Sequence, residues 1–163
     1  MDSGPFKKIL VHVDGSENSI TAVQFAICLT RLFDAELTAI YVVNTRALKD
    51  LLKAHIFIES EEQEYQRDLE SDSERYLDHA RDLARSKGVA IETVCRNGTV
   101  HQEIRDYIAE NDIGLLVLGE IEYVRHRRDE MYGEAEMALH RAGCSVLVVK
   151  DEERVWEQFD ALA

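Results

Sequence analysis

The sequence is poor in several residues that mark particular protein classes. Of its 163 residues only three are cysteine, Cys28, Cys95 and Cys144, and no two of them form a CxxC pair. This small, odd number argues against a disulfide framework and fits a reducing compartment. No apolar run approaches the roughly 18 residues of a membrane span, and Met1–Phe6 has no apolar core of a signal peptide. We therefore expect a cytoplasmic protein without membrane insertion.

Basic residues are also scarce relative to acidic ones. The chain has 19 Lys and Arg against 32 Asp and Glu, which gives a formal net charge of −13. Such a charge opposes binding to phosphate backbones, so we expect no nucleic-acid partner. Hydrophobic residues make up 45% of the sequence, which suits one packed core and argues against disorder. The length corresponds to about one domain.

The acidic residues are concentrated in one segment. Between Glu59 and Glu74 there are eight acidic residues and one basic residue, Arg67, so this segment alone contributes −7. Such a run is usually a solvated helix face, and a docking surface for a basic partner protein is the alternative. The charge count does not separate the two interpretations.

Apolar runs alternate with stretches of helical periodicity along the chain. The runs predict five strands, at Lys7–Val13, Glu36–Val43, Val89–Cys95, Leu115–Leu118 and Ser145–Val149. The periodic stretches predict helices from Ser16, over Tyr65–Ala84, from Thr99 to about Glu110, over Asp129–Ala142 and over Asp151–Asp160. The segment Thr45–Ser60 is ambiguous, and its apolar cluster Leu51–Ile58 fits either packing over the sheet or an exposed patch.

Short polar motifs predict where these elements begin and end. Ser16 is suited to cap the first helix, and Gly88 suits the left-handed residue that follows a helix. Asn97-Gly98 predicts a turn, and Thr99 with Gln102 predicts a capping box. Regular alternation of strands and helices implies a mostly parallel sheet with helices on both faces. We expect one α/β domain over residues 1–150 and a C-terminal extension over residues 151–163.

Both ends of this pattern resemble universal stress protein domains. The opening Phe6–Ser16 (FKKILVHVDGS) resembles the start of the family, and Ala35–Val43 looks like its second strand. The close, Ala142–Lys150 (AGCSVLVVK), is similar to its final passage from helix to strand. The resemblance implies a Rossmann-like, adenine nucleotide alpha hydrolase-like fold, with an open parallel five-stranded sheet in the order 3-2-1-4-5.

The resemblance also implies where a nucleotide would bind. Ligands of open α/β sheets bind at the carboxyl ends of the strands where the strand order reverses, here between the first and fourth strands. The candidate residues on the amino-terminal side are His12, Asp14, Gly15, Ser16 and Val42. Asp14 resembles the aspartate beside the nucleoside, and it could equally cap the turn. His12 is either a ligand contact or a core residue, and Val42 lines either an adenine pocket or an ordinary core.

The phosphate loop of ATP-binding relatives is altered in this chain. Its pattern is Gly, two residues, Gly, nine residues, Gly and then Ser or Thr. Without a gap, these positions fall on Gly119, Glu122, Tyr132 and Gly133, so only the first glycine is retained. A non-glycine residue in a left-handed conformation costs roughly 1–2 kcal/mol. A carboxylate about 4 Å from a phosphate oxygen costs up to about 4 kcal/mol at an effective dielectric of 20. We therefore expect no tight binding of MgATP.

One basic stretch favours the opposite conclusion. Arg125–Arg128, which includes the candidate Arg127, lies in the same loop and could hold phosphates through its side chains. The alternative is that these residues pair with acidic neighbours such as Glu134. An adenine nucleotide therefore stays open as a cofactor, although none is required.

The sequence offers no catalytic constellation. Four histidines, His55, His79, His101 and His140, lie far apart, and no pair has metal-ligand spacing with cysteine or carboxylate, so we expect no metal site. Ser16 has no base near it in the sequence, and nothing resembles a nucleophile elbow. We expect no catalytic residue and no enzymatic activity.

The last strand predicts a homodimer. In the 3-2-1-4-5 order it lies at a sheet edge, and it is apolar after its first residue. Such an edge invites a second strand, and universal stress proteins commonly dimerise here. The expected interface residues are Ser145, Val146, Leu147, Val148 and Val149. The alternative is that Val155, Trp156 and Phe159 fold back over the edge.

These observations lead to one interpretation and two alternatives. The leading interpretation is a stress-response or regulatory domain of universal stress protein type, which acts by dimerising and by binding a protein partner. The first alternative is a sensor of AMP or ATP with a remodelled phosphate loop. The second is a slow ATPase, which the altered loop disfavours.

Overall fold

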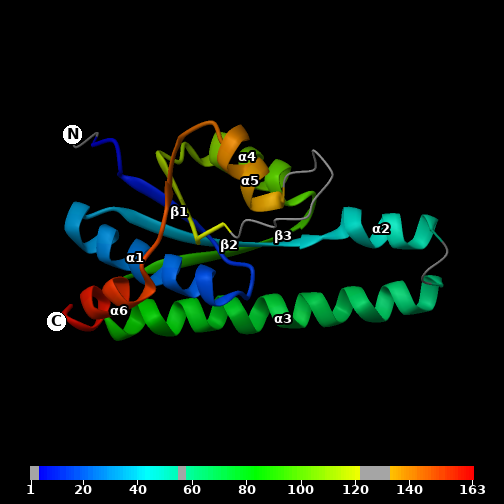
Figure 1. Cartoon of the computed structure of the whole chain (residues 1–163), viewed down its shortest axis with the longest axis horizontal. Helices are drawn as coiled ribbons and strands as arrows, with labels where there is room; N and C mark the ends of the chain where they lie inside the picture. Colours follow the sequence, from blue (N-terminus) through cyan, green and yellow to red (C-terminus); the bar gives the residue numbers. More distant parts are fainter. Residues whose placement is uncertain (1–3, 55–57, 122–132) are drawn as a thin grey trace.

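Five parallel strands form one sheet in the part of the chain that the structure describes (Figure 1). The computed structural model describes residues 4–54, 58–121 and 133–163. The strand order is β3-β2-β1-β4-β5, and every neighbouring pair is parallel. The strands are β1 (Lys8–His12), β2 (Glu36–Asn44), β3 (Ile91–Gly98), β4 (Leu115–Leu118) and β5 (Ser145–Val148). The predicted fold class and strand order are confirmed.

Helices cover both faces of the sheet (Figure 1). The helices on one face are α1 (Glu17–Phe33), α3 (Glu59–Ser86) and α6 (Glu152–Asp160). The helices on the other face are α4 (Val100–Asn111) and α5 (Glu134–Arg141). In the central strand β1, Ile9 and Val11 belong to the first core and Leu10 to the second, and all three are fully buried. This double burial explains why the central strands are continuously apolar.

Two helix termini follow the sequence motifs and one does not. The Ser16 hydroxyl accepts a hydrogen bond from the Ser19 amide at 3.2 Å, and Gly88 takes a φ of +68° after α3. These two predictions are confirmed. The predicted capping box is wrong, because the Thr99 side chain makes no capping hydrogen bond. A carboxylate from another helix, Glu134, accepts from the His101 amide instead.

The predicted turn at Asn97-Gly98 is also wrong. Both residues belong to β3, which begins at Ile91 and pairs with β2 through Gly98. The nine-residue strand β2 provides partners as far as Asn44, so the edge strand extends with it. The chain turns toward α4 only at Gly98, where φ is +150°.

The ambiguous segment after β2 begins with a helix, α2 (Thr45–Lys53), anchored by the buried Leu48. Residues 55–57 lie outside the described ranges. The 28 residues of α3 span about 42 Å at a rise of about 1.5 Å per residue, and α2 and the amino half of α3 project beyond the sheet (Figure 1). Within the acidic segment, Glu61, Glu64 and Asp68 are exposed, which is the pattern of a solvated helix face. Docking of a basic partner there stays a prediction.

The carboxyl-terminal helix packs on α1 and not along the sheet edge (Figure 1). Its Val155 and Phe159 are buried in the first core, whereas Trp156 remains 57% exposed. The alternative in which this segment covers β5 is therefore wrong. Within the described ranges no strand pairs with the outer edge of β5, and Val146, Leu147 and Val148 are only half-buried.

Candidate functional site

The structure brings several predicted site residues together at one end of the sheet. His12 ends β1, and Gly119 directly follows the neighbouring strand β4. The turn Asp14–Ser16 leads from β1 into α1. These residues lie at the carboxyl ends of β1 and β4, where ligands of open α/β sheets bind. Gly133 is the N-cap of α5, whereas the candidates Glu122, Arg127 and Tyr132 lie outside the described ranges.

Asp14 holds the turn that begins α1. Its Oδ1 accepts from the Ser16 amide at 2.9 Å and from the Ser16 hydroxyl at 2.5 Å. Burial by itself raises the pKa of Asp14, but the hydrogen bonds from Ser16, together with His12 and Ser19, lower that pKa below its ordinary value. The capping role of Asp14 is therefore present in the structure, and its role beside a nucleoside stays a prediction.

Position 15 requires glycine for two reasons, its positive φ and the close approach of Tyr76. It takes a φ of +84°, and a Cβ built on it would lie 2.6 Å from the ring of Tyr76 on α3. Tyr76 in turn stacks on Tyr41 of β2 with ring centroids 6.2 Å apart. Helix α3 thus packs against the turn Asp14–Ser16 through Tyr76. Sequence reasoning placed Tyr76 only on the apolar face of a helix, because a contact with residue 15 has no local signal.

His12 and Val42 are both core residues in the structure. Each is only 7% exposed, and Val42 packs among the apolar residues beneath α4. Burial lowers the pKa of His12, and the negative charges of Asp14 and Glu134 oppose this effect only in part. The imidazole is therefore neutral near pH 7. A contact of either residue with a ligand stays a prediction.

The retained glycine of the phosphate-loop pattern has a packing role. A Cβ on Gly119 would lie 2.6 Å from the backbone of Asn18, in the first turn of α1. The Asn18 side-chain amide also donates to the carbonyl oxygen of Glu120 at 3.1 Å. Close contact between the end of β4 and α1 explains this glycine without a nucleotide.

Glu134 brings a negative charge to the amino ends of two helices. It lies in the first turn of α5, and its Oε2 accepts from the His101 amide of α4 at 3.1 Å. The same oxygen lies 2.8 Å from Nδ1 of His101. Helix amino termini attract anions, so this carboxylate occupies a position suited to a phosphate oxygen. Sequence reasoning paired Glu134 with the basic stretch and missed His101, because the two residues lie 33 positions apart.

A five-stranded parallel sheet of this order, with polar residues where β1 and β4 end, is an α/β domain with the adenine nucleotide alpha hydrolase-like fold. The model of the "Universal stress protein family" matches residues 5–150. The chain therefore belongs to the universal stress protein family, as its two ends indicated, and is a stress-response domain of that type. Helix α6 lies beyond the matched residues.

Curated relatives and solved structures agree with this assignment. The chain is 30% identical over 149 residues to the universal stress protein MJ0531 of Methanocaldococcus jannaschii, covering 91% of this chain and 85% of the relative. It is 28% identical over 152 residues to YxiE of Bacillus subtilis, covering 89% and 99%. The structure of UspA from Lactobacillus plantarum superposes with a TM-score of 0.70 at 22% identity, covering 89% and 98%.

Two further structures of the same fold carry nucleotides. One is a universal stress protein in complex with cAMP, with a TM-score of 0.64 at 20% identity, covering 88% of this chain and 96% of the other. The other is a family protein of Arabidopsis thaliana with AMP bound, with a TM-score of 0.62 at 14% identity, covering 91% and 94%. At these identities the likeness shows the fold alone.

Proposed function

We propose that this protein is a cytoplasmic, non-enzymatic regulatory domain that acts by dimerising and binding a protein partner, without tight binding of MgATP. Residues 1–150 form the domain, and residues 151–163 are an extension of it. The candidate interface is the β5 edge, from Ser145 to Val149. No helix within the described ranges is long and apolar enough to cross a membrane.

The position of Glu134 carries this proposal. A phosphate held at the amino ends of α4 and α5 would meet a carboxylate that already accepts the His101 amide. Glu136 adds a second negative charge in the first turn of α5. Repulsion of about 4 kcal/mol at 4 Å and an effective dielectric of 20 would lower the affinity for triphosphate by several powers of ten.

Isothermal titration with MgATP tests the proposal directly. We expect no heat of binding at micromolar concentrations of protein and nucleotide. The variant Glu134→Gln should bind MgATP at least fivefold more tightly than the wild type, because it removes the charge at the His101 amide. The variant Glu136→Gln removes the second charge from the same helical turn, and because Glu136 does not accept from the His101 amide, it should tighten binding less than Glu134→Gln does. A micromolar or tighter dissociation constant for the wild type would overturn the proposal.

A second candidate function is an adenine-nucleotide sensor. It is favoured by the relatives of the same fold with cAMP and AMP, and by the retained turn Asp14–Ser16. A ligand with fewer phosphates meets less repulsion from Glu134. Three results together would favour this sensor over the first proposal. The wild type would bind AMP at micromolar concentration, Asp14→Asn would lose this binding, and MgATP would not bind.

A further inference from the structure

Two helical segments form an arm that projects beyond the sheet (Figure 1). The arm consists of α2, the N-cap Ile58 of α3, and α3 as far as Glu74. Its apolar side chains are only partly covered, because Leu51 and Leu52 are half-buried. Ile58 is 63% exposed and Tyr65 is 44% exposed, and a separation of seven positions places them on one face of α3. The arm therefore leaves an apolar strip open to a partner.

Basic side chains form a row along the outside of α2. Arg46, Lys49 and Lys53 are exposed, and their spacing of three and then four residues places them on one face of the helix. None of the three makes an ion pair or hydrogen bond with another described residue. The chain has a formal net charge of −13, yet no carboxylate in its described part neutralises this row.

Carboxylates form a matching row along α3. Glu61, Glu64 and Asp68 are exposed and have the same spacing of three and then four residues. Each row thus spans about 10.5 Å at a rise of about 1.5 Å per residue. Glu61 accepts from the Ile58 amide at 3.1 Å, but none of the three carboxylates forms an ion pair among the described residues. Glu61 and Asp68 follow Ile58 and Tyr65 by three positions, so the acidic row borders the apolar strip.

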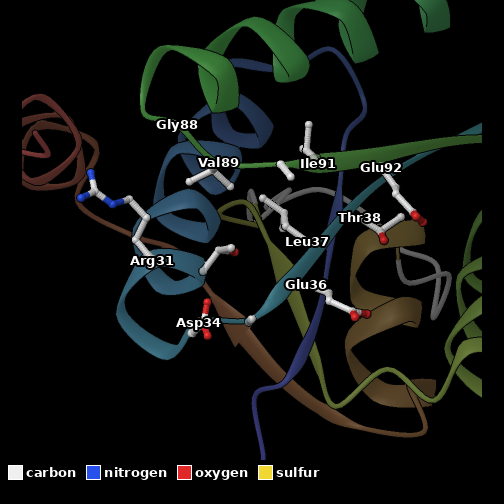
Figure 2. A pocket seen from close by; sticks show the side chains of 12 residues that line it. Arg31, Asp34, Glu36, Leu37, Thr38, Gly88, Val89, Ile91 and Glu92 are labelled. Atoms are coloured by element: carbon white, nitrogen blue, oxygen red, sulfur yellow. The ribbon is translucent and has the colours of Figure 1, made fainter.

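Elsewhere on the surface, charges of both signs are mixed. At a hollow where β2 and β3 begin, Arg31 lines the same wall as Asp34 and Glu36 (Figure 2). In the later part of α3, three arginines each pair with the aspartate three positions earlier, as Arg75–Asp72, Arg81–Asp78 and Arg85–Asp82. On the arm the two signs are instead separated onto two helices with equal spacing. This separation makes the arm complementary in charge to a second copy of itself.

We propose that the arm binds the arm of a second copy of this chain. The basic row of α2 faces the acidic row of α3 in the other copy, and a two-fold axis repeats the same contact with the roles exchanged. The apolar strips with Ile58 and Tyr65 meet between the rows, so the four helices form a bundle. Ion pairs between the copies then neutralise charges that have no partner within one copy.

This contact is separate from the predicted β5 interface. Helix α3 packs on β2 and β3, and the strand order places β3 and β5 at opposite edges of the sheet. One molecule can therefore use both surfaces at once. The contact is also independent of the proposed nucleotide site, which lies where β1 and β4 end.

Sedimentation of the full chain at increasing concentration tests the arm contact. Small interfaces are weak, so we expect the arm to associate at about 0.5 mM protein and not at micromolar concentration. In Val148→Lys, which lacks the β5 contact, this step should run from monomer to dimer. In about 1 M salt the Debye length is about 3 Å, and the step should weaken.

Two double variants of α3 distinguish the acidic row from overall charge. Glu64→Lys with Asp68→Lys reverses the row and should raise the dissociation constant of the arm step at least tenfold. Glu70→Lys with Glu74→Lys is the matched control, because it changes the net charge equally and at the same spacing. The control residues lie on another face of the helix, so this change should not weaken the association.

A charge exchange between copies tests the pairing of the two rows. Lys49→Glu with Lys53→Glu makes α2 acidic and should also raise the dissociation constant at least tenfold. A mixture of this variant with the Glu64→Lys, Asp68→Lys variant should associate again, because each reversed row then faces the opposite sign. The α2 variant keeps the test valid if the α3 variant folds poorly.

Three results would overturn the proposal. The first is no association beyond the β5 contact at about 0.5 mM protein. The second is equal weakening by the row variant and its control, which would mean a general charge effect only. The third is a mixture of the two row variants that stays unassociated, which would leave the arm to a different partner. None of these results depends on nucleotide binding, and Val148→Lys separates them from a failure of the β5 interface.

Discussion

At the turn after β1, each residue is fixed by a different physical constraint. Asp14 accepts two hydrogen bonds from Ser16, Gly15 needs a positive φ, and Ser16 caps α1. The contact between Gly15 and Tyr76 of α3 links the turn to a distant part of the chain. The turn therefore depends on α3 as well as on its own sequence.

Replacing Gly15 tests this dependence. Gly15→Ala forces a left-handed alanine, which costs about 1–2 kcal/mol, and in addition displaces the Tyr76 ring. Gly88→Ala is the matched control, because Gly88 also has a positive φ but no atom within 4 Å of its Cβ position. We expect Gly15→Ala to lower the free energy of unfolding by at least about 1 kcal/mol more than Gly88→Ala. Equal losses in urea denaturation would show that Tyr76 does not constrain the turn.

The buried His12 predicts a dependence of stability on pH. Because burial lowers its pKa in the folded state, the unfolded chain binds the proton more readily. Stability from this residue is therefore complete above the unfolded pKa of about 6.5 and decreases as the pH falls below it. In His12→Gln the decrease in unfolding free energy between pH 7 and pH 5 should be smaller than in the wild type. An identical decrease in both proteins would contradict this assignment.

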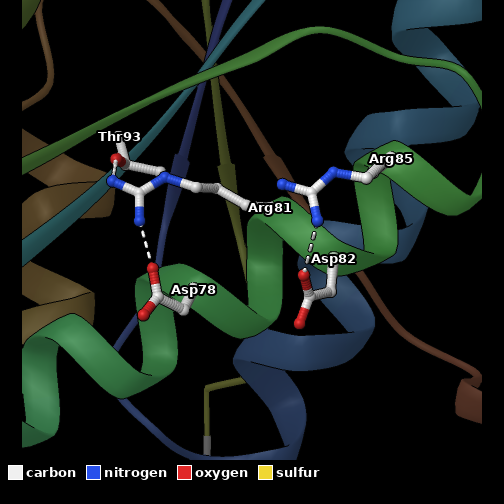
Figure 3. Close-up of polar contacts among 5 residues, drawn as sticks. All are labelled: Asp78, Arg81, Asp82, Arg85 and Thr93. Atoms are coloured by element: carbon white, nitrogen blue, oxygen red, sulfur yellow. Dashed lines mark hydrogen bonds and ion pairs between the residues drawn. The ribbon is translucent and has the colours of Figure 1, made fainter.

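Among the helices, α3 combines a structural half and a projecting half. Its carboxyl half packs on the sheet through Leu77, Ala80 and Ala84, whereas its amino half carries the acidic segment Glu59–Glu74 beyond the sheet. Figure 3 shows that the structural half is also tied to the edge strand. There Arg81 donates to Asp78 of α3 and to the Thr93 hydroxyl of β3.

The contribution of the Arg81–Thr93 hydrogen bond to the free energy of unfolding can be measured by comparison with a neighbouring arginine. Arg85 lies one turn further along α3, and among the described residues its side chain pairs only with Asp82, at 3.3 Å. Exposed pairs within one helix contribute about 0.3–0.5 kcal/mol, and a hydrogen bond to another element adds about 1 kcal/mol. Arg81→Ala should therefore destabilise the protein by about 1 kcal/mol and Arg85→Ala by less than about 0.5 kcal/mol. If a double-mutant cycle of Arg81→Ala with Thr93→Val gave no coupling energy, the Arg81–Thr93 hydrogen bond would not contribute to stability.

At the scale of the whole molecule, we expect the uncovered edge of β5 to determine how copies associate. Helix α6 packs on α1, so within the described residues only a second chain can pair with this edge. We expect a dimer in sedimentation at micromolar concentration and a monomer for Val148→Lys, since a buried ammonium would face its own copy across the axis. The control Trp156→Lys changes an exposed residue of α6 and should stay dimeric. A monomeric wild type would overturn this prediction.

The sequence by itself determined the elements other than α2, their order in the chain and two of the helix ends. These features are local: they depend on residues within a few positions of one another and can therefore be predicted from the sequence. They are the strand runs, the helical periodicity, the Ser16 cap and the positive φ of Gly88. The resemblance at the two chain ends added the strand order, which the structure confirmed. Candidate site residues that lie outside the described ranges, such as Glu122 and Tyr132, stay predictions.

The tertiary structure decided which side chains complete the site. Glu134, and not Thr99, accepts a hydrogen bond from the amino terminus of α4. The ring of Tyr76 lies close to Gly15. Pairing with β2 likewise converted the expected turn at Asn97-Gly98 into strand. Each of these contacts joins residues far apart in the chain, and its geometry follows from how the helices pack on the sheet. Local sequence patterns contain no information about that packing, and so these features appear only in the folded molecule.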